Sequence, residues 1–197
     1  MHWLIWVALI VGGYLVGSIP SAYILVKLKN GVDIRRFGSG NVGTTNTVRA
    51  AGHAMGALVF IFDVAKGAIP TLIGLSISPE LALVAGISAF AGHIWPIWLS
   101  FKGGKGVATG FGVALALQPL IALIVISTWL LISLITNYVS LGSSTAAALL
   151  PILAVGTRQN LMIIIVFAVM AVVIIWRHRK NFLNIRAGTE GKLFNRK

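Results

Sequence analysis

Long apolar runs recur along the whole chain, and they leave few folds open to it. A helix needs about 20 consecutive apolar residues to cross a bilayer, and such runs extend from Trp3 to Trp176. With 57% hydrophobic and 10% charged residues, the composition excludes an ordinary soluble domain. In lipid, backbone polar groups must be satisfied within the segment, which favours helices. The sequence therefore predicts one all-α membrane domain over residues 1–197.

The runs predict a bundle of seven transmembrane helices, some of them short or broken. They cover residues 3–26, 54–75, 81–99, two spans within 107–136, a span that starts within 137–144 and ends at 155, and 161–176. The two spans within 107–136 are separated at Gln118-Pro119, because a single straight helix of that length would measure about 45 Å. Pro20 is expected to kink or unwind the first span, and Gly13, Gly17 and Ser21 are expected to pack closely against another helix.

Basic residues indicate the orientation. With the N-terminus outside, the first polar loop, the loop at 101–106, the break at 137–144 and the C-terminal tail are cytoplasmic. These segments hold fourteen of the sixteen Lys and Arg residues, as the positive-inside rule requires. The net charge of +12 therefore indicates cytoplasmic loops near anionic lipids or substrates, and no nucleic acid is expected. We expect a multi-pass protein of the inner (plasma) membrane, with a cytoplasmic C-terminus and its polar motifs on the cytoplasmic side.

The most unusual segment is residues 38–49, GSGNVGTTNTVR. Glycines allow backbone N–H groups to converge on an anion, and Arg49 adds a planar cation that matches phosphate. Alone, the segment could equally be a glycine-rich turn between two helices. A second cationic loop, FKGGKG at 101–106, lacks the spacing of a Walker A loop, and it could also be a membrane anchor. Asp63 and Lys66 share a helical face inside a span, where both structural pairing and substrate positioning remain open.

Several chemistries are excluded or unsupported. The chain has no cysteine, which removes disulfides, thiolate metal sites and a cysteine nucleophile. No His-x4-Asp arrangement, GxSxG elbow or metal-ligand spacing is found, so neither a metal nor a cofactor is expected. Many anion-binding groups without an evident base suit a reaction in which the donor is already activated.

Residues 38–49, then GHIWPIWLSFKGGKGVAT and the Gly188-Thr189-Glu190 segment, resemble the three cytoplasmic motifs of the bacterial acylphosphate:glycerol-3-phosphate acyltransferase family. The segments GSIPSAY, DVAKG, YVSL and WRHRKN are also similar to that family. The resemblance implies transfer of a fatty acyl group from acyl phosphate to the sn-1 hydroxyl of glycerol 3-phosphate, giving lysophosphatidic acid and phosphate without an acyl-enzyme. The competing hypothesis is an organic-anion transporter or channel, for which a broken helix and intramembrane charges would also be suitable.

The resemblance also implies site residues. Those expected in catalysis are Ser39, Arg49, Lys105 and His178; those expected to bind substrate are Gly38, Gly40, Asn41, Thr45, Asn46, His93, Lys102, Gly103, Gly104, Ser143, Arg177, Asn181 and Glu190. Lys105 is favoured over Lys102 as the phosphate contact, and Glu190 is expected to order the tail or a basic neighbour. The second ionisation of a phosphate monoester has a pKa of about 6, so the glycerol phosphate dianion could itself accept the hydroxyl proton.

Overall fold

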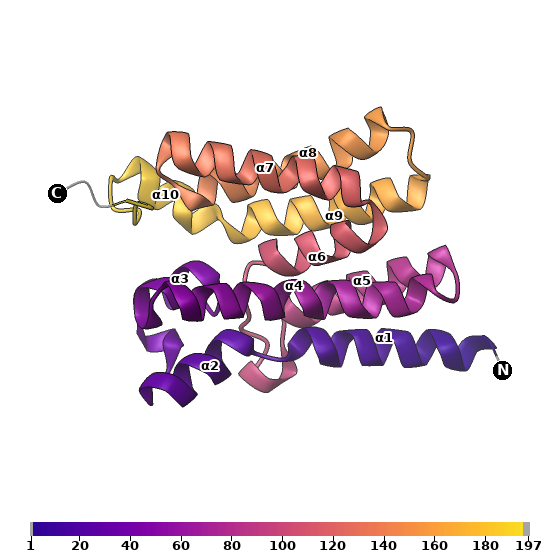
Figure 1. Cartoon of the computed structure of the whole chain (residues 1–197), viewed down its shortest axis with the longest axis horizontal. Helices are drawn as coiled ribbons and strands as arrows, with labels where there is room; N and C mark the ends of the chain where they lie inside the picture. The colour runs from indigo at the N-terminus through magenta and orange to yellow at the C-terminus, as the bar shows by residue number, and fades with distance from the viewer. Residues whose placement is uncertain (1, 195–197) are drawn as a thin grey trace. The chain divides into compact units, whose positions relative to one another are not determined.

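The computed structural model describes residues 2–194, and every regular element in this part of the chain is a helix (Figure 1). This confirms the all-α prediction. The chain forms two compact units, residues 1–117 and residues 118–197. Each unit is described below by itself.

The first unit is built around three long helices. Its elements are α1 (His2–Ser18), α2 (Ser21–Asn30), η1 (Ile34–Arg36), α3 (Thr44–Ala51), α4 (His53–Leu75), α5 (Pro79–Ile94), η2 (Ile97–Leu99) and α6 (Val107–Leu117). α5 lies against α1 and α4, and α4 also packs on α6. Small residues make these contacts close: an added Cβ on Gly13 would lie 2.7 Å from the Ala85 carbonyl oxygen, and one on Gly17 would collide with Ala89. The packing role predicted for Gly13 and Gly17 is thus confirmed.

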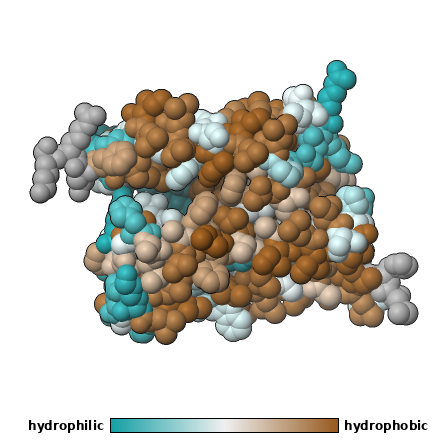
Figure 2. Space-filling view, in the orientation of Figure 1, coloured by the Kyte–Doolittle hydropathy of each residue, from teal (hydrophilic) through white to brown (hydrophobic). Residues whose placement is uncertain are grey.

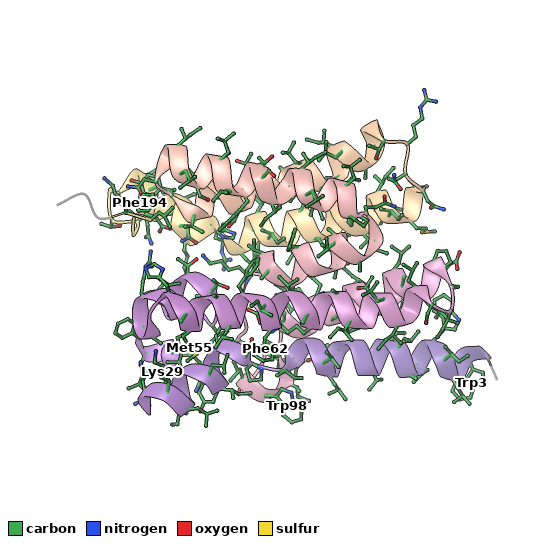
Figure 3. All side chains as sticks on the ribbon, viewed as in Figure 1. Trp3, Lys29, Met55, Phe62, Trp98 and Phe194 are labelled. Carbon is green, nitrogen blue, oxygen red and sulfur yellow. The ribbon has the colours of Figure 1, made fainter. Side chains whose placement is uncertain are left out.

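The first span breaks at Ile19-Pro20, between α1 and α2. Proline has no backbone N–H and cannot continue the hydrogen-bonding ladder of a helix, so the predicted interruption is confirmed. Residues 3–30 still form one continuous apolar stretch that is long enough to cross a bilayer. Trp3 and Lys29, near the two ends of this stretch, are labelled in Figure 3.

Part of the motif at 38–49 is helical, which the sequence interpretation as a loop missed. The segment from Thr44 onward forms the eight-residue α3, because Val42, Thr47 and Val48 anchor it on the unit: Val42 and Thr47 are buried, and a Cβ on Gly56 would collide with the Val48 side chain. Lys29 Nζ and Asn30 Nδ2 each donate a 2.9 Å hydrogen bond to a carbonyl at the C-terminal end of α3. These bonds satisfy carbonyls that a helix end leaves without partners.

The predicted count of seven spans is not confirmed. The described residues contain five helices long and apolar enough to cross a membrane, or six if α9 and α10, bent by 43°, form one span. The fourth expected span is α6, which has only 11 residues. At 1.5 Å per residue this helix measures about 16 Å, roughly half of the hydrocarbon core. It is short because residues 100–106 fold back on the end of α5 and the helix starts only at Val107.

The second unit consists of α7 (Pro119–Thr136), α8 (Val139–Gly156), α9 (Leu161–Arg177) and the short α10 (Arg179–Arg186). Pro119 starts α7 at the position expected from the sequence. α8 begins at Val139, within the 137–144 segment where the span was expected to start, so Ser140, Ser143 and Ser144 lie inside the helix and are buried. α7 and α9 both pack on α8.

Apolar side chains cover much of the surface shown in Figure 2. Residues such as Phe62 on α4, Leu131 on α7 and Val172 on α9 expose more than half of their surface. A soluble monomer rarely presents contiguous apolar surface of this extent. In a membrane protein the lipid covers it, and the chain is therefore a membrane protein.

Candidate functional site

The loop at residues 37–43 is held from beneath by Asn46, a buried residue of α3 (1% exposed). Its Nδ2 donates to the carbonyl oxygens of Ile34, Phe37 and Asn41 at 3.3, 2.9 and 3.0 Å, and its Oδ1 accepts from the Ser39 N–H at 3.1 Å. Both ends of the amide are therefore used inside the protein. In the structure Asn46 supports the loop, and the substrate-binding role expected for it stays a prediction.

Gly38 and Gly40 have positive φ angles, +55° and +70°, a conformation that glycine adopts without steric cost. A Cβ on Gly38 would also collide with the Asn46 side chain. The two glycines thus let the chain turn tightly over Asn46. Ser39, between them, and Arg49, in the last turn of α3, are both exposed, while Asn41 and Thr45 are half-buried.

An ion pair stabilises the approach to this loop. Arg35 contacts the Asp33 carboxylate through Nε and Nη2, with a shortest distance of 2.7 Å, and the Arg35 N–H also donates to Asp33. The hydrogen bonds from the Arg35 side chain lower the pKa of Asp33 to about 2. The Arg35 guanidinium lies 5.3 Å from the centre of the Tyr23 ring, within the range of a cation–π contact.

The loop at residues 100–106 folds onto the C-terminal end of α5. Gly103 N–H donates to the Ile94 carbonyl and Gly104 N–H donates to the His93 carbonyl, both at 3.1 Å. A Cβ on Gly103 would collide with the His93 carbonyl oxygen, and one on Gly104 would collide with the His93 ring. The two glycines are therefore required by close packing. Lys102 is exposed and Lys105 is half-buried.

Asp63 and Lys66 form a buried ion pair in the middle of α4, 2.7 Å apart, with both side chains less than 10% exposed. Ser21 Oγ donates to Asp63 Oδ1, and Lys66 Nζ donates to the Ile19 carbonyl at 3.0 Å. Both of these partners lie at the break in the first span. His93 Nδ1 is 3.8 Å from the same Asp63 oxygen. The structural-pairing alternative for these two charges is therefore the one that the geometry favours.

The second unit carries another set of the expected residues. His178 is buried at the junction of α9 and α10, and its Nδ1 lies 2.8 Å from the Ile174 carbonyl oxygen. Because a carbonyl only accepts hydrogen bonds, this contact requires the proton on Nδ1 and leaves Nε2 as the acceptor in the neutral ring. Ser143, buried in α8, accepts a 3.2 Å hydrogen bond from Trp129 Nε1. Arg177, the last residue of α9, is half-buried beside His178.

Glu190 joins α10, the tail and α8. Its Oε1 accepts hydrogen bonds from Asn181 Nδ2 at 2.7 Å and from Ser140 Oγ at 3.1 Å, and its Oε2 accepts from Asn184 Nδ2 at 3.4 Å. Through these contacts Glu190 links the tail to α8 and α10, and the substrate-binding role expected for it stays a prediction. The contacts also show that Asn181 has one of its donors committed to a structural partner.

Asn137 fixes the tail at a second point, which the sequence interpretation missed. Its side chain donates to the Phe194 carbonyl at 3.0 Å and accepts from the Phe194 N–H at 2.7 Å, and its own carbonyl accepts from the Leu193 N–H. Asn137 has a φ of +62°, a conformation for which asparagine is enriched. An asparagine directly after a long apolar run was the available signal. Ser21 was expected only as a small residue in a helix-packing contact, and the sequence interpretation missed its hydrogen bond to Asp63.

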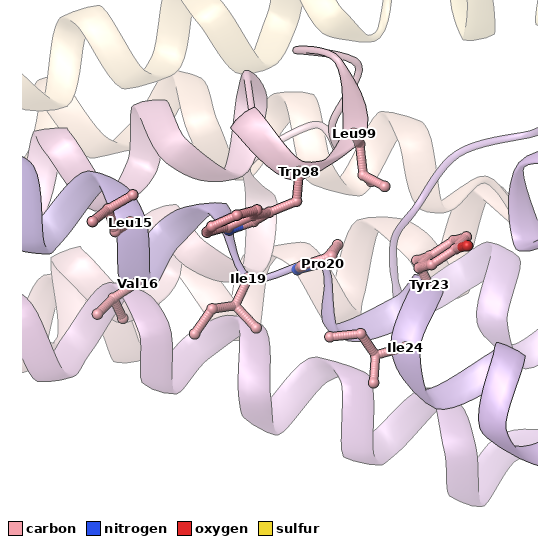
Figure 4. A pocket seen from close by; sticks show the side chains of 8 residues that line it. All are labelled: Leu15, Val16, Ile19, Pro20, Tyr23, Ile24, Trp98 and Leu99. Atoms are coloured by element: carbon pink, nitrogen blue, oxygen red, sulfur yellow. The ribbon is translucent and has the colours of Figure 1, made fainter.

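An apolar groove of about 500 Å³ lies beside the break in the first span (Figure 4). It is lined by Leu15, Val16, Ile19, Pro20, Tyr23, Ile24, Trp98 and Leu99. This lining suits hydrocarbon and has no group that would hold a phosphate. The residues of the first unit that were expected to bind anions lie instead in the 37–43 loop, α3 and the 100–106 loop.

Known proteins resemble this chain over most of its length. A family model described as glycerol-3-phosphate acyltransferase matches residues 7–188. A glycerol-3-phosphate acyltransferase of Brucella anthropi is 40% identical over 184 residues, which cover 93% of this chain and 91% of that protein. One of Thermoanaerobacter pseudethanolicus is 42% identical over 181 residues, with 91% of each chain covered.

Two crystal structures share the fold. Both are of PlsY (YgiH), an integral membrane glycerol 3-phosphate acyltransferase. The glycerol 3-phosphate form has a TM-score of 0.93 and 39% identity, covering 96% of each chain. The lysophosphatidic acid form has a TM-score of 0.89 and 38% identity, covering 95% of this chain and 94% of that one.

Proposed function

The chain belongs to the glycerol-3-phosphate acyltransferase family, and from this premise we propose that it transfers a fatty acyl group from acyl phosphate to the sn-1 hydroxyl of glycerol 3-phosphate. The products are lysophosphatidic acid and inorganic phosphate. The reaction takes place at the cytoplasmic side of the inner membrane. In this orientation the N-terminus lies outside the cytoplasm and the basic C-terminal tail lies inside it.

One observation carries the proposal. Asn46 fixes the 37–43 loop through its backbone, so that Ser39 remains exposed and Arg49 lies in the last turn of the adjoining helix. A turn that carries an exposed hydroxyl and is followed by an exposed arginine on the next helix is suited to a phosphate, because a guanidinium binds two phosphate oxygens at once. Both proposed substrates carry such a group, and the apolar groove beside the break is suited to lipid.

The proposed transfer is direct. The sn-1 hydroxyl oxygen of glycerol 3-phosphate attacks the carbonyl carbon of the acyl phosphate and forms a new ester C–O bond. The bond from that carbon to the bridging phosphate oxygen breaks, and phosphate leaves. Because the leaving group is phosphate, no protein nucleophile is needed, and the absence of cysteine is compatible with the reaction. Ser39, Arg49 and Lys105 bind substrate phosphate and stabilise the negative charge that develops as the phosphate leaves.

The hydroxyl proton passes to the phosphate dianion of glycerol 3-phosphate in this proposal. The rate should then rise with an apparent pKa close to the second ionisation of that phosphate. His178 and His93 are the protein groups that could give a similar profile. A phosphonate analogue with a different second pKa should move the acidic limb of the kcat profile, whereas His178→Gln and His93→Gln should each keep the limb. A limb that disappears in one histidine variant and ignores the analogue would identify that histidine as the base.

Purified protein in detergent, supplied with acyl phosphate and glycerol 3-phosphate, tests the function itself. Formation of lysophosphatidic acid is the expected result, and acyl-CoA in place of acyl phosphate should give no product. An organic-anion transporter, for which the broken first helix and the buried Asp63–Lys66 pair are also suitable, would form no product in this assay and would move anion across vesicles.

A further inference from the structure

His93 lies between the buried Asp63 carboxylate and the backbone of the 100–106 loop. It occupies the last turn of α5 and is only 6% exposed. On one side, its Nδ1 lies 3.8 Å from Asp63 Oδ1, too far for a hydrogen bond but within the range of an electrostatic contact. On the other, its Nε2 lies so close to Gly104 that a Cβ at that position would collide with the ring. The ring therefore fills the space between a buried carboxylate and the backbone of the 100–106 loop.

Asp63 is itself held by groups from two other segments. Lys66 Nζ contacts it at 2.7 Å, and Ser21 Oγ, at the start of α2, donates to it. Lys66 in turn donates to the Ile19 carbonyl. Pro20 and the break remove helical hydrogen bonds at this point, so the lysine supplies a donor to a carbonyl near the interruption. Buried charges are costly unless they are paired and hydrogen-bonded, and here both conditions are met.

We propose that His93 is a positioning residue, and that the Asp63–Lys66 pair holds its ring against Gly104 so that the 100–106 loop presents Lys105 to a substrate phosphate. This assignment rests on the proposed acyltransferase function. It replaces direct substrate binding by His93 with an indirect role, and it gives the intramembrane ion pair a use in the reaction. The break in the first span, the ion pair, the histidine and the loop form one connected support.

The mobility of a spin label in the 100–106 loop tests this support without an enzyme assay. The chain has no cysteine, so a spin label at F101C, an exposed position in the loop, is unique. We expect the label to become more mobile in His93→Ala and in the double variant D63L/K66M, which removes both buried charges together and leaves neither unpaired. His93→Asn keeps an amide donor near the position of Nδ1 and should keep the label immobilised. Equal immobilisation in all variants would overturn the proposal.

Kinetics separate a positioning role from direct contact. His93→Ala and D63L/K66M should each lower kcat/KM by about 10- to 100-fold, as small displacements of a positioned group do. Because both changes act through the same support, combining them should cost no more than about twofold beyond the worse of the two. His93→Asn should recover most of the activity when Asp63 is present and none of it in D63L/K66M. Losses that multiply in the combined variant would show that His93 acts on the substrate independently.

Two controls match these changes. Glu80→Gln alters an exposed acid at the other end of α5 and should change neither the label nor the rate. Gly104→Ala should lose activity through the collision with His93, whereas Gly12→Ala, where an added Cβ meets nothing within 4 Å, should not. Thermal unfolding in detergent reports whether each variant is folded. If wild-type protein formed no lysophosphatidic acid, the proposed function would fail while the label mobility would still decide the role of His93.

Discussion

Replacing Asn46 tests whether one buried amide sets the shape of the 37–43 loop. Asn46→Ala removes four hydrogen bonds, three donated to carbonyls and one accepted from the Ser39 N–H. The amide NH2 has only two hydrogens for the three carbonyls, so the contacts amount to about three full hydrogen bonds, worth about 1.5–4.5 kcal/mol at a net 0.5–1.5 kcal/mol each. The Phe37 carbonyl keeps a hydrogen bond from Gly40 N–H, and the Ile34 carbonyl keeps one from Phe37 N–H. Because these carbonyls keep a partner, we expect the loss to stay below the upper end of the range, at about 2–4 kcal/mol.

A change of this size shifts the equilibrium between the ordered and the open loop by roughly 30- to 1,000-fold. Because the loop is a local element, we expect it to open while the helices stay folded. Asn46→Asp should be worse than alanine at pH 7, since a carboxylate oxygen would then face three carbonyl oxygens in a buried position. The isosteric change therefore separates the loss of donors from the loss of volume.

The assay combines the initial rate of lysophosphatidic acid formation with limited trypsin digestion. Opening of the loop should expose the bonds after Arg35 and Arg36 to cleavage. Asn160→Ala is the matched control: it removes one exposed amide that accepts from the Met162 N–H at the start of α9, and it should leave the loop cleavage unchanged. Wild-type rates and cleavage patterns in both Asn46 variants would refute the reasoning.

Three further predictions follow from particular contacts. Arg49→Lys should lose at least about tenfold in kcat/KM with normal membrane expression, because an ammonium cannot bind phosphate bidentately; a wild-type rate would show that charge alone matters. The pKa of Asp33 is lowered from 3.8 to about 2. Its pairing with Arg35 therefore stabilises the fold fully at pH values above the unfolded pKa, and this stabilisation is lost as the pH falls towards 2. Hydrogen exchange of the Arg35 amide, corrected for the intrinsic rate, should be constant from pH 8 to 5 and should increase only below about pH 4. Asn137→Gly keeps the left-handed backbone but loses two side-chain hydrogen bonds to Phe194, at a cost of about 1–3 kcal/mol, so trypsin should cleave after Lys192 faster; an unchanged rate would mean that the backbone contact to Leu193 is sufficient.

The sequence by itself determined the class of the protein and the chemistry of its motifs. In lipid the backbone polar groups of such long apolar runs are satisfied within helices, and Pro20 lacks a backbone N–H donor wherever it is placed. Such local properties do not depend on which distant segments pack against the residue. For the same reason Pro119 marked the start of α7, and the family could be recognised from short motifs whose residue types were sufficient.

Tertiary structure decided which polar residues act as supports. Asn46, His93 and Glu190 belong to motifs just as Ser39 and Arg49 do, and nothing in their residue types separates a buried amide that holds a loop from an exposed group that can meet a substrate. That difference arises from contacts between segments distant in sequence, such as Lys66 with Ile19 and Glu190 with Ser140. The length of α6 was decided in the same way, because hydrogen bonds from Gly103 and Gly104 to the end of α5 keep the preceding loop from becoming helical. A hydropathy pattern carries no information about such contacts, since they depend on how helices pack against one another.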